Sequence, residues 1–302
     1  MLDMREGLLI ENARVDVATG FVVDASGVAV PVTRYMRTGK HVRTKYLPLQ
    51  PNSPTEPLDI PLVVAHNSSW RNYCHWLMQT AFCAWAWTRF PNQVKALFLT
   101  PKLDAFQEQI LRLAGLDAAH HHQAASDAKL STPLAVVMPD AFRPSSIHPS
   151  PRMGEFGRHV SMQIPAAGDT PRRLYVSRRD STKRRLENEV EIEAALVRHG
   201  FSIVTLTGVS FPDQVRLFRN VEIVVGPHGA GFANLLFCQP GTRVIELTPS
   251  TYVNPRFVRL SKVCGLRHEV ETFLAHGLRH ETRWRADTER VLDALRRSHA
   301  AV

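Results

Sequence analysis

The sequence predicts an α/β protein composed of two Rossmann-like halves. Strand-like and helix-like stretches alternate from Leu62 to Met138, and the same alternation restarts at Leu174 and continues to Leu247. A proline-bearing passage over residues 143–171 separates the two runs. Because strands and helices that alternate with short links are typical of parallel sheets covered by helices, we expect one such sheet in each half.

Composition limits the class of protein. The chain has 302 residues, with 44% hydrophobic and 22% charged residues, which is typical of a folded protein of one large or two medium domains. A net charge of +9 indicates anionic partners, either nucleic acid, phosphorylated small molecules or an acidic membrane surface. The sequence has no leader pattern and no apolar run of the roughly 18 residues that a membrane helix needs, so we expect a cytoplasmic protein. The four cysteines lack paired spacing and are expected to be buried thiols.

Residues 1–57 are expected to form an accessory β region and a linker. Turn signals such as Thr19-Gly20 interrupt loosely alternating stretches there, and five prolines follow between Pro48 and Pro61. Residues 58–165 are then expected to form the N-terminal Rossmann-like domain. Its predicted elements are a strand from Leu62 to Ala65, a helix from Asn72 to Arg89, a strand from Val94 to Leu99, a helix from Asp104 to Ala114 and a strand from Leu134 to Met138.

Residues 166–302 are expected to form the C-terminal Rossmann-like domain. Its predicted strands are Leu174 to Ser177, Phe201 to Leu206, Val221 to Val225 and Val244 to Leu247, and its predicted helices are Leu186 to His199, Phe211 to Arg219 and Gly229 to Cys238. The tail from Asp287 to His299 places Val291, Leu292 and Leu295 on one helical face. We expect this last helix to pack back on the N-terminal domain.

The glycine-rich turn after the strand at Val221 predicts an anion site. Parallel strands gather their carboxyl ends along one rim, where open α/β sheets bind ligands. Gly226, Gly229 and Gly231 have the order G-x-x-G-x-G, which differs from the dinucleotide pattern G-x-G-x-x-G. Their turn opens a helix, whose free N–H groups at Gly229, Ala230 and Gly231 suit a phosphate. The alternative is a tight turn that needs glycine only for its positive φ.

Polar residues on the same rim extend this interpretation. Ser177 and Arg178 end one strand, and Arg184 and Arg185 precede the next helix; guanidinium groups suit diphosphate oxygens, whereas the alternative is a solvated basic loop. Glu246 ends another strand and is a candidate for binding both ribose hydroxyls, the alternative being a carboxylate paired with an arginine. Asn234 is a candidate donor-binding residue, or a polar group on a helix face.

Three segments together resemble a known family. "GPHGAGFANLLFCQPGTRVIEL" is similar to the H-G-A-x-L-x-N-x-L-F-x-P-x-G-x-x-V-x-E-[IL] signature of glycosyltransferase family 61, with mild departures at Phe232 and Gln239. "LYVSRRDSTKRRLENEVEI" resembles its Y-[IV]-S-R…R-R-x-x-N-E segment, and "NYCHWLMQT" its N-[YF]-x-H-W-L motif. The resemblance covers about residues 60–250. It implies a GT-B architecture, with two Rossmann-like domains facing a cleft, and inverting transfer from a nucleotide-sugar in bacterial capsular polysaccharide biosynthesis.

Inverting transfer needs a base for the acceptor hydroxyl and stabilisation of the leaving diphosphate. The candidate bases are His75, His66, Asp140 and His228, of which His75 is preferred because the resemblance places it at the cleft. We expect His228, beside the phosphates, to be protonated and to stabilise charge. The candidate acceptor-binding residues are His66, Asn72 and Trp76. No Asp-x-Asp motif occurs, so no metal or other cofactor is expected.

Rival interpretations remain at this point. Three consecutive histidines, His120 to His122, are expected to form a polar loop rather than a metal site. Trp76, Trp85 and Trp87 are expected in the core, and the basic segment lacks the aromatic residues typical of nucleic-acid binding. The expected partners are a nucleotide-sugar, a glycan or lipid-linked acceptor and the inner membrane face. The alternative functions are an NAD(P)-dependent oxidoreductase and a catalytically inactive binding protein in polysaccharide assembly.

Overall fold

The computed structural model describes residues 7–34, 49, 53–89, 94–142, 149–166, 168–277 and 281–297. The chain divides into two compact units, Met1–Ser150 and Pro151–Val302. Each unit contains parallel strands and helices, so the predicted α/β class is confirmed. The boundary falls in the proline-bearing passage over residues 143–171, part of which lies outside the described residues.

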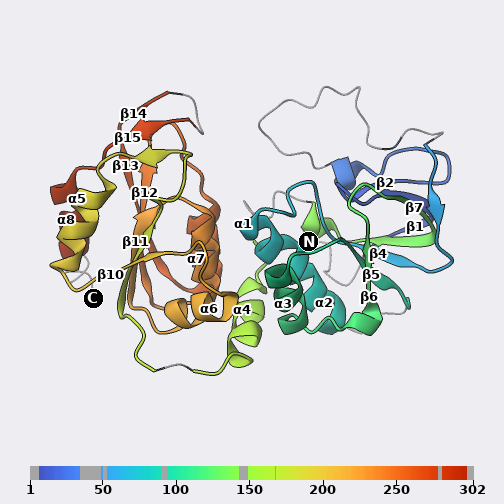
Figure 1. Cartoon of the computed structure of the whole chain (residues 1–302), viewed down its shortest axis with the longest axis horizontal. Helices are drawn as coiled ribbons and strands as arrows, with labels where there is room; N and C mark the ends of the chain where they lie inside the picture. The colour runs from blue at the N-terminus through green and yellow to red at the C-terminus, as the bar shows by residue number, and fades with distance from the viewer. Residues whose placement is uncertain are drawn as a thin grey trace. The chain divides into compact units, whose positions relative to one another are not determined.

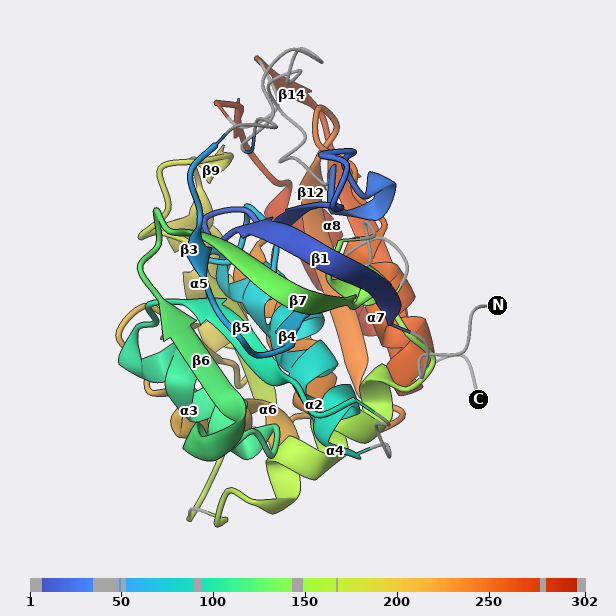
Figure 2. The ribbon, with the colours of Figure 1, turned by 90° about the vertical axis from the view of Figure 1, so that its right-hand side faces the viewer.

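The first unit is built on a seven-stranded sheet. Its strands are β1 (Leu8–Asp16), β2 (Phe21–Val23), β3 (Glu56–Pro57), β4 (Leu62–Val64), β5 (Leu97–Pro101), β6 (His121–Ala124) and β7 (Lys129–Val137). Their order is β2-β1-β7-β4-β5-β6, with β3 paired to β7, and Figure 2 shows the main strands side by side. Strands β4 to β7 run parallel, so their carboxyl ends share one edge of the sheet.

Two predictions for this unit were wrong. The N-terminal strands are not a separate accessory region, because β1 pairs antiparallel with β7 and buries Ala13 and Val15 in the same core. The three histidines do not form a loop: His120 ends a 3-10 turn, and His121 and His122 lie in the edge strand β6. An edge strand buries little of its surface, so its sequence carries no strong apolar pattern.

The helices of the first unit include the predicted long helix, in three parts. The elements are η1 (Pro31–Arg34), α1 (Tyr73–His75), η2 (Trp76–Ala81), α2 (Phe82–Arg89), α3 (Ala105–Leu113), η3 (Ala118–His120) and η4 (Pro139–Ala141). The predicted helix Asn72 to Arg89 is confirmed, but its middle third, η2, is a π-helix. Trp76 and Trp85 are buried within it, as predicted.

The second unit has a five-stranded parallel sheet. Its strands are β8 (Arg173–Ser177), β10 (Ser202–Thr205), β11 (Ile223–Pro227), β12 (Arg243–Pro249) and β13 (Arg267–Phe273), and a smaller sheet contains β9 (Arg185–Leu186), β14 (Ala275–His276) and β15 (Arg283–Trp284). The order is β10-β8-β11-β12-β13. Numbered along the chain, this is the doubly wound order 2-1-3-4-5, which reverses direction between β8 and β11.

Helices cover both faces of this sheet. They are α4 (Met153–Met162), α5 (Glu189–Val197), α6 (Phe211–Arg219), η5 (Ala230–Phe237), α7 (Arg256–Cys264) and α8 (Thr288–Arg297). Figure 1 shows α5 and α8 on one side and α6 and α7 on the other. The predicted strands and helices of this half are confirmed in order, although the helix predicted from Leu186 begins at Glu189 and η5 is a 3-10 helix. The elements α4, α7, β9, β13, β14 and β15 were not predicted. Helix α4, which lies before the predicted boundary at residue 165, packs against α6 and α7.

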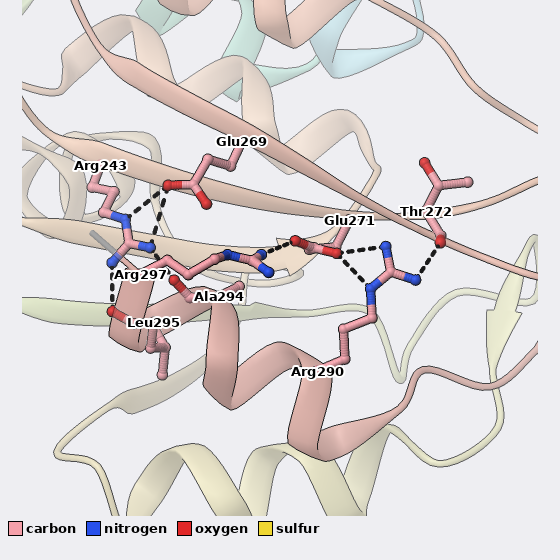
Figure 3. Close-up of polar contacts among 8 residues, drawn as sticks. All are labelled: Arg243, Glu269, Glu271, Thr272, Arg290, Ala294, Leu295 and Arg297. Carbon is pink, nitrogen blue, oxygen red and sulfur yellow. Dashed lines mark hydrogen bonds and ion pairs between the residues drawn. The ribbon is translucent and has the colours of Figure 1, made fainter. Parts of the chain in front are cut away.

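The C-terminal helix α8 packs within the second unit, which corrects the prediction that it returns to the first. Arg290 and Arg297 of α8 both form ion pairs with Glu271 on β13 (Figure 3). Arg243 of β12 donates to the carbonyls of Ala294 and Leu295 near the end of α8, the latter at 3.0 Å. The buried Val291 and Leu292 face the core beside α5. The amphipathic face therefore has its partner in its own sheet.

Candidate functional site

A cavity of about 200 Å³ lies at the carboxyl ends of β8, β10 and β11. Its lining includes Ser177, Arg178, Asp180, Thr207, Gly229 and Gly231. This is the point at which the strand order reverses, and in open α/β sheets the two neighbouring loops diverge there and leave a crevice. The structure thus brings together the rim residues that parallel topology predicts.

Arg178 is held in this cavity by both its backbone and its side chain. Its N–H donates to Glu189 at 2.8 Å, and its guanidinium donates to the carbonyl of His228 at 2.5 Å and to Ser181 at 2.7 Å. Burial, together with the nearby positive Arg184, lowers the pKa of Arg178 to about 10. The guanidinium is therefore charged at neutral pH, in a place that disfavours a cation without an anionic partner.

Arg184 brings a second positive charge to the same carbonyl. Its guanidinium lies 4.3 Å from the centroid of the Tyr252 ring, and its Nη2 lies 3.5 Å from the carbonyl oxygen of His228. The backbone of Arg184 has a φ of 52°, a conformation that L-residues rarely adopt, and its carbonyl accepts a hydrogen bond from Trp284 Nε1. Burial lowers the pKa of Arg184. Arg185, by contrast, is exposed on β9.

The glycines of the turn are required by close packing. None of Gly226, Gly229 and Gly231 has a positive φ, so the tight-turn alternative was wrong. A Cβ on Gly229 would lie 2.0 Å from Arg178 Nη1. Cβ atoms on Gly226 and Gly231 would lie 2.7 and 2.8 Å from atoms of Val176 and Leu206. The turn thus lacks side chains where Arg178 and two neighbouring strand ends approach its backbone.

His228 belongs to a buried chain of polar side chains. Its Nδ1 lies 2.5 Å from Glu246 Oε1, and the other oxygen of Glu246 lies 3.1 Å from His268 Nε2. Ser261 Oγ lies 2.7 Å from His268 Nδ1. Parallel pairing of β11, β12 and β13 brings these groups together, because Glu246 lies in β12 beside the end of β11 and His268 is the second residue of β13.

Burial and hydrogen bonding shift the pKa values of His228 and Glu246. Burial lowers the pKa of His228 despite the nearby Glu246, a direction opposite to the one expected beside a phosphate. Burial opposes ionisation of Glu246, but hydrogen bonds from His228 and His268 outweigh it and hold the pKa of Glu246 below its ordinary value. Glu246 is 0% exposed and both its oxygens are occupied, which does not support direct ribose binding. Its carboxylate instead orients the His228 ring.

Two further predicted donor-binding residues, Asn234 and Ser177, have buried side chains. Asn234 is fully buried on η5, where its Nδ2 donates to Gln214 at 2.9 Å, so it is a helix-face polar group rather than a donor contact. Ser177 is buried, and its Oγ accepts a hydrogen bond from the N–H of Arg179 at 3.3 Å. Ser177 does line the cavity.

In the first unit, His75 lies at the end of α1 with its side chain half-buried. Its Nδ1 lies 2.7 Å from Oε1 of the fully buried Gln79. Asn72 begins the helix by accepting hydrogen bonds from the N–H groups of Cys74 and His75, so its carbonyl oxygen has a capping role. Asp140 is half-buried in η4.

Two predicted acceptor-binding residues are inaccessible. His66 and Trp76 are both 0% exposed. His66 Nε2 donates to the carbonyl of Val17 at 2.8 Å, and burial lowers the pKa of His66 to about 4, so its ring is a neutral core group. A side chain without exposed surface cannot contact an acceptor, which rules out these two predictions in this conformation.

Sequence reasoning missed several residues around the site. His268 and Tyr252 follow the last recognised motif, and no spacing rule connects them to His228. Gln79 was inside a quoted motif, and its place four residues after His75 was a usable signal, because such pairs face each other on a helix. Glu189 was quoted as a motif match; its carboxylate accepts hydrogen bonds from Arg178 N–H and the Tyr175 hydroxyl.

Comparison with known proteins gives consistent matches. The family model of Glycosyltransferase 61 matches residues 73–245, more than half of the chain. A beta-1,2-xylosyltransferase of Arabidopsis thaliana is 25% identical over 138 residues, covering 37% of this chain and 26% of the relative. Beta-1,2-xylosyltransferase RCN11 of Oryza sativa subsp. japonica is 34% identical over 53 residues, covering 18% of this chain and 10% of the relative. The chain thus aligns with about a quarter or less of these curated relatives.

The matched segment, residues 73–245, includes both helix α1 with His75 and the turn with His228. No helix in the described ranges combines the length and the apolarity that a membrane crossing requires.

Proposed function

The chain belongs to the glycosyltransferase 61 family, and on that premise we propose that it transfers a sugar from a nucleotide-sugar donor to a glycan or lipid-linked acceptor. The observation that carries the proposal is the convergence of Arg178 and Arg184 on the His228 carbonyl beside the switch-point cavity. Two partly desolvated cations side by side repel each other, and an anion between or beside them relieves that repulsion. A donor diphosphate supplies such an anion.

The proposed architecture is GT-B, with two Rossmann-like domains facing a cleft. In it, the first unit, Met1–Ser150, binds the acceptor and the second unit, Pro151–Val302, binds the donor. The parallel strands of each unit and the position of the cavity in the second unit support this division. Arg185, which is exposed on β9, is kept as a candidate for contact with the far end of the donor.

The proposed mechanism is a single inverting displacement. His75 accepts the proton of the acceptor hydroxyl as its oxygen attacks the anomeric carbon, with Asp140 as the alternative base. The bond to the diphosphate breaks, and Arg178, Arg184 and the N–H groups of Gly229 to Gly231 stabilise the departing charge. No metal is assigned to this step, because the arginines supply the positive charge.

The proposed setting is bacterial surface polysaccharide assembly at the inner face of the membrane. The net charge of +9 supports peripheral binding to anionic lipid, which high salt would reverse. The relatives named above are plant beta-1,2-xylosyltransferases, so a nucleotide-xylose is a sensible first donor to test.

The direct test is a turnover screen. The protein is incubated with UDP-xylose and other nucleotide-sugars, with and without EDTA, and release of the nucleoside diphosphate is measured with and without glycan acceptors. We expect release that survives EDTA, is lost in Arg178→Ala and persists in Arg179→Ala, which removes a neighbouring exposed arginine. Binding of a nucleotide-sugar without turnover would support the inactive relative instead, and binding of NAD alone would support the oxidoreductase.

A further inference from the structure

A chain of hydrogen bonds runs from the backbone to His75 through two buried amide side chains. Asn67 is 1% exposed, and Gln79, on the π-helical η2, is 0% exposed. Asn67 Nδ2 lies 3.0 Å from Gln79 Oε1, and His75 Nδ1 lies 2.7 Å from the same oxygen. All three side chains belong to the first unit.

The backbone fixes the orientation of the first amide. The N–H of Ser69 donates to Asn67 Oδ1 at 2.8 Å, and in an amide side chain only the oxygen can accept such a bond. The other end of Asn67 must then be its NH₂ group, which donates to the carbonyl of Ala141 at 2.5 Å and to Gln79. An amide orientation is normally inferred from its hydrogen-bond network, and here a backbone donor settles it.

The orientation of Asn67 fixes the orientation of Gln79 and the tautomer of His75. Because the Asn67 group is a donor, the Gln79 atom that it meets must be the carbonyl oxygen. That oxygen has no proton to give, so the His75 nitrogen beside it must carry one. His75 therefore holds its proton on Nδ1, and when the imidazole is neutral the lone pair is on Nε2.

Packing alone does not explain a glutamine at this position. Burying an amide is unfavourable unless its polar atoms are hydrogen-bonded, and methionine would fill a similar volume without that requirement. The segment is also π-helical from Trp76 to Ala81, and π-helical turns occur frequently at functional sites. Both observations point to a task for Gln79 beyond filling the core.

We infer that Gln79 is a positioning residue for His75 and that Asn67 holds Gln79 in the required orientation. The inference rests on the proposed function, in which His75 is the base. With its proton fixed on Nδ1, His75 takes the acceptor hydroxyl proton on Nε2. The acceptor oxygen forms its bond to the sugar carbon, and the electron pair of the breaking carbon–oxygen bond leaves with the diphosphate.

The first test reads the tautomer without any substrate. Nitrogen-15 NMR of histidine-labelled protein, recorded at alkaline pH, distinguishes the Nδ1–H form from the Nε2–H form, and His75→Asn identifies the signals of His75. We expect Nδ1–H in the wild type and loss of this preference in Gln79→Met. An Nε2–H tautomer in the wild type, or an unchanged tautomer in Gln79→Met, would overturn the inference.

The second test is kinetic, with a matched control. Gln79→Met should lower kcat by about tenfold to a hundredfold, the range known for outer partners of metal-bound histidines, and change KM by less than about twofold. Gln107→Met removes another fully buried glutamine of the same unit, which contacts Trp70 rather than His75, and should leave kcat unchanged. Gln79→Glu keeps an acceptor oxygen beside His75 Nδ1 and should therefore retain the Nδ1–H tautomer that Gln79→Met loses. An equal loss of kcat in both methionine variants would refute a specific role for Gln79.

Failure of the base assignment to His75 and failure of the proposed function give different results. If His75→Asn retains full transfer, the base assignment is wrong and the role of Gln79 falls with it, while the family activity stands. If the wild type transfers sugar from no donor, the proposed function fails, and the tautomer measurement still decides whether Gln79 orients His75.

Discussion

At Gly229 the absence of one methyl group lets the Arg178 guanidinium reach the carbonyl of His228. The guanidinium occupies the space that a Cβ would take, at 2.0 Å from Nη1. The contact between Arg178 and the His228 carbonyl therefore requires glycine at position 229, although 50 residues separate Arg178 from His228. The glycine turn, expected to hold a phosphate, also makes room for an arginine that lines the same cavity.

The substitution Gly229→Ala tests whether the position of Arg178 depends on this glycine. The added methyl group must displace Arg178, so we expect affinity for a nucleoside diphosphate to fall by about tenfold or more, with little change in stability. Isothermal titration measures the affinity. Gly168→Ala is the matched control, because a Cβ there meets nothing within 4 Å. Equal affinity in wild type and Gly229→Ala would contradict this role of the glycine.

A second residue-scale prediction concerns His66. Its pKa is lowered by burial from 6.5 to about 4, so the unfolded chain binds a proton more readily than the folded one. The free energy of unfolding therefore includes the full contribution of neutral His66 above pH 6.5, and it loses this contribution as the pH falls towards 4. At roughly 1.4 kcal/mol per pKa unit this amounts to about 3 kcal/mol. Urea unfolding monitored by tryptophan fluorescence should show a shallower loss in His66→Gln over this range. The same slope in both proteins would contradict the assignment.

At the scale of elements, the motif-bearing strands and helices could be predicted because their apolar patterns are strong. The β11 segment is followed by glycines, and α6 starts with Pro212 after the capping Ser210. Helix α7 could also have been found, since it ends at Gly265 in the left-handed conformation. The π-helical form of η2 could not, because it depends on tertiary packing of a segment whose sequence is simply helical.

The attachment of α8 gives an element-scale prediction. Arg243 is buried and donates to the carbonyls of Ala294 and Leu295, so Arg243→Met leaves these acceptors without that donor. We expect a loss of about 1–3 kcal/mol in the unfolding free energy of the second unit, measured by urea denaturation. Arg296→Met, which removes only exposed ion pairs of the same helix, should cost less than about 1 kcal/mol. A similar cost for both would mean that Arg243 does not secure the helix.

At the scale of the whole molecule, the sequence predicts the α/β class and the edge of the second sheet at which the cavity lies, because parallel topology alone gathers strand ends. The sequence does not predict how deeply each candidate side chain is buried. Trp76 and Asn234 were chosen from motif matches and His66 was not, yet all three are fully buried. A motif match does not show whether a side chain lines a site or lies in the core behind it. His268 was missed because strand pairing across β12 and β13, rather than spacing along the chain, brings it to Glu246.

The central claim is that the cavity beside Arg178 binds the nucleoside diphosphate of a sugar donor without a metal. The measurement that tests it most directly is a thermal-shift screen of the wild type, Arg178→Ala and Arg179→Ala against UDP, GDP, CMP, TDP, their sugar conjugates and NAD(P), each with and without EDTA. We predict that one nucleoside diphosphate stabilises the wild type and Arg179→Ala in EDTA and has no effect on Arg178→Ala. Stabilisation by NAD alone, or stabilisation of Arg178→Ala equal to that of the wild type, would contradict the account.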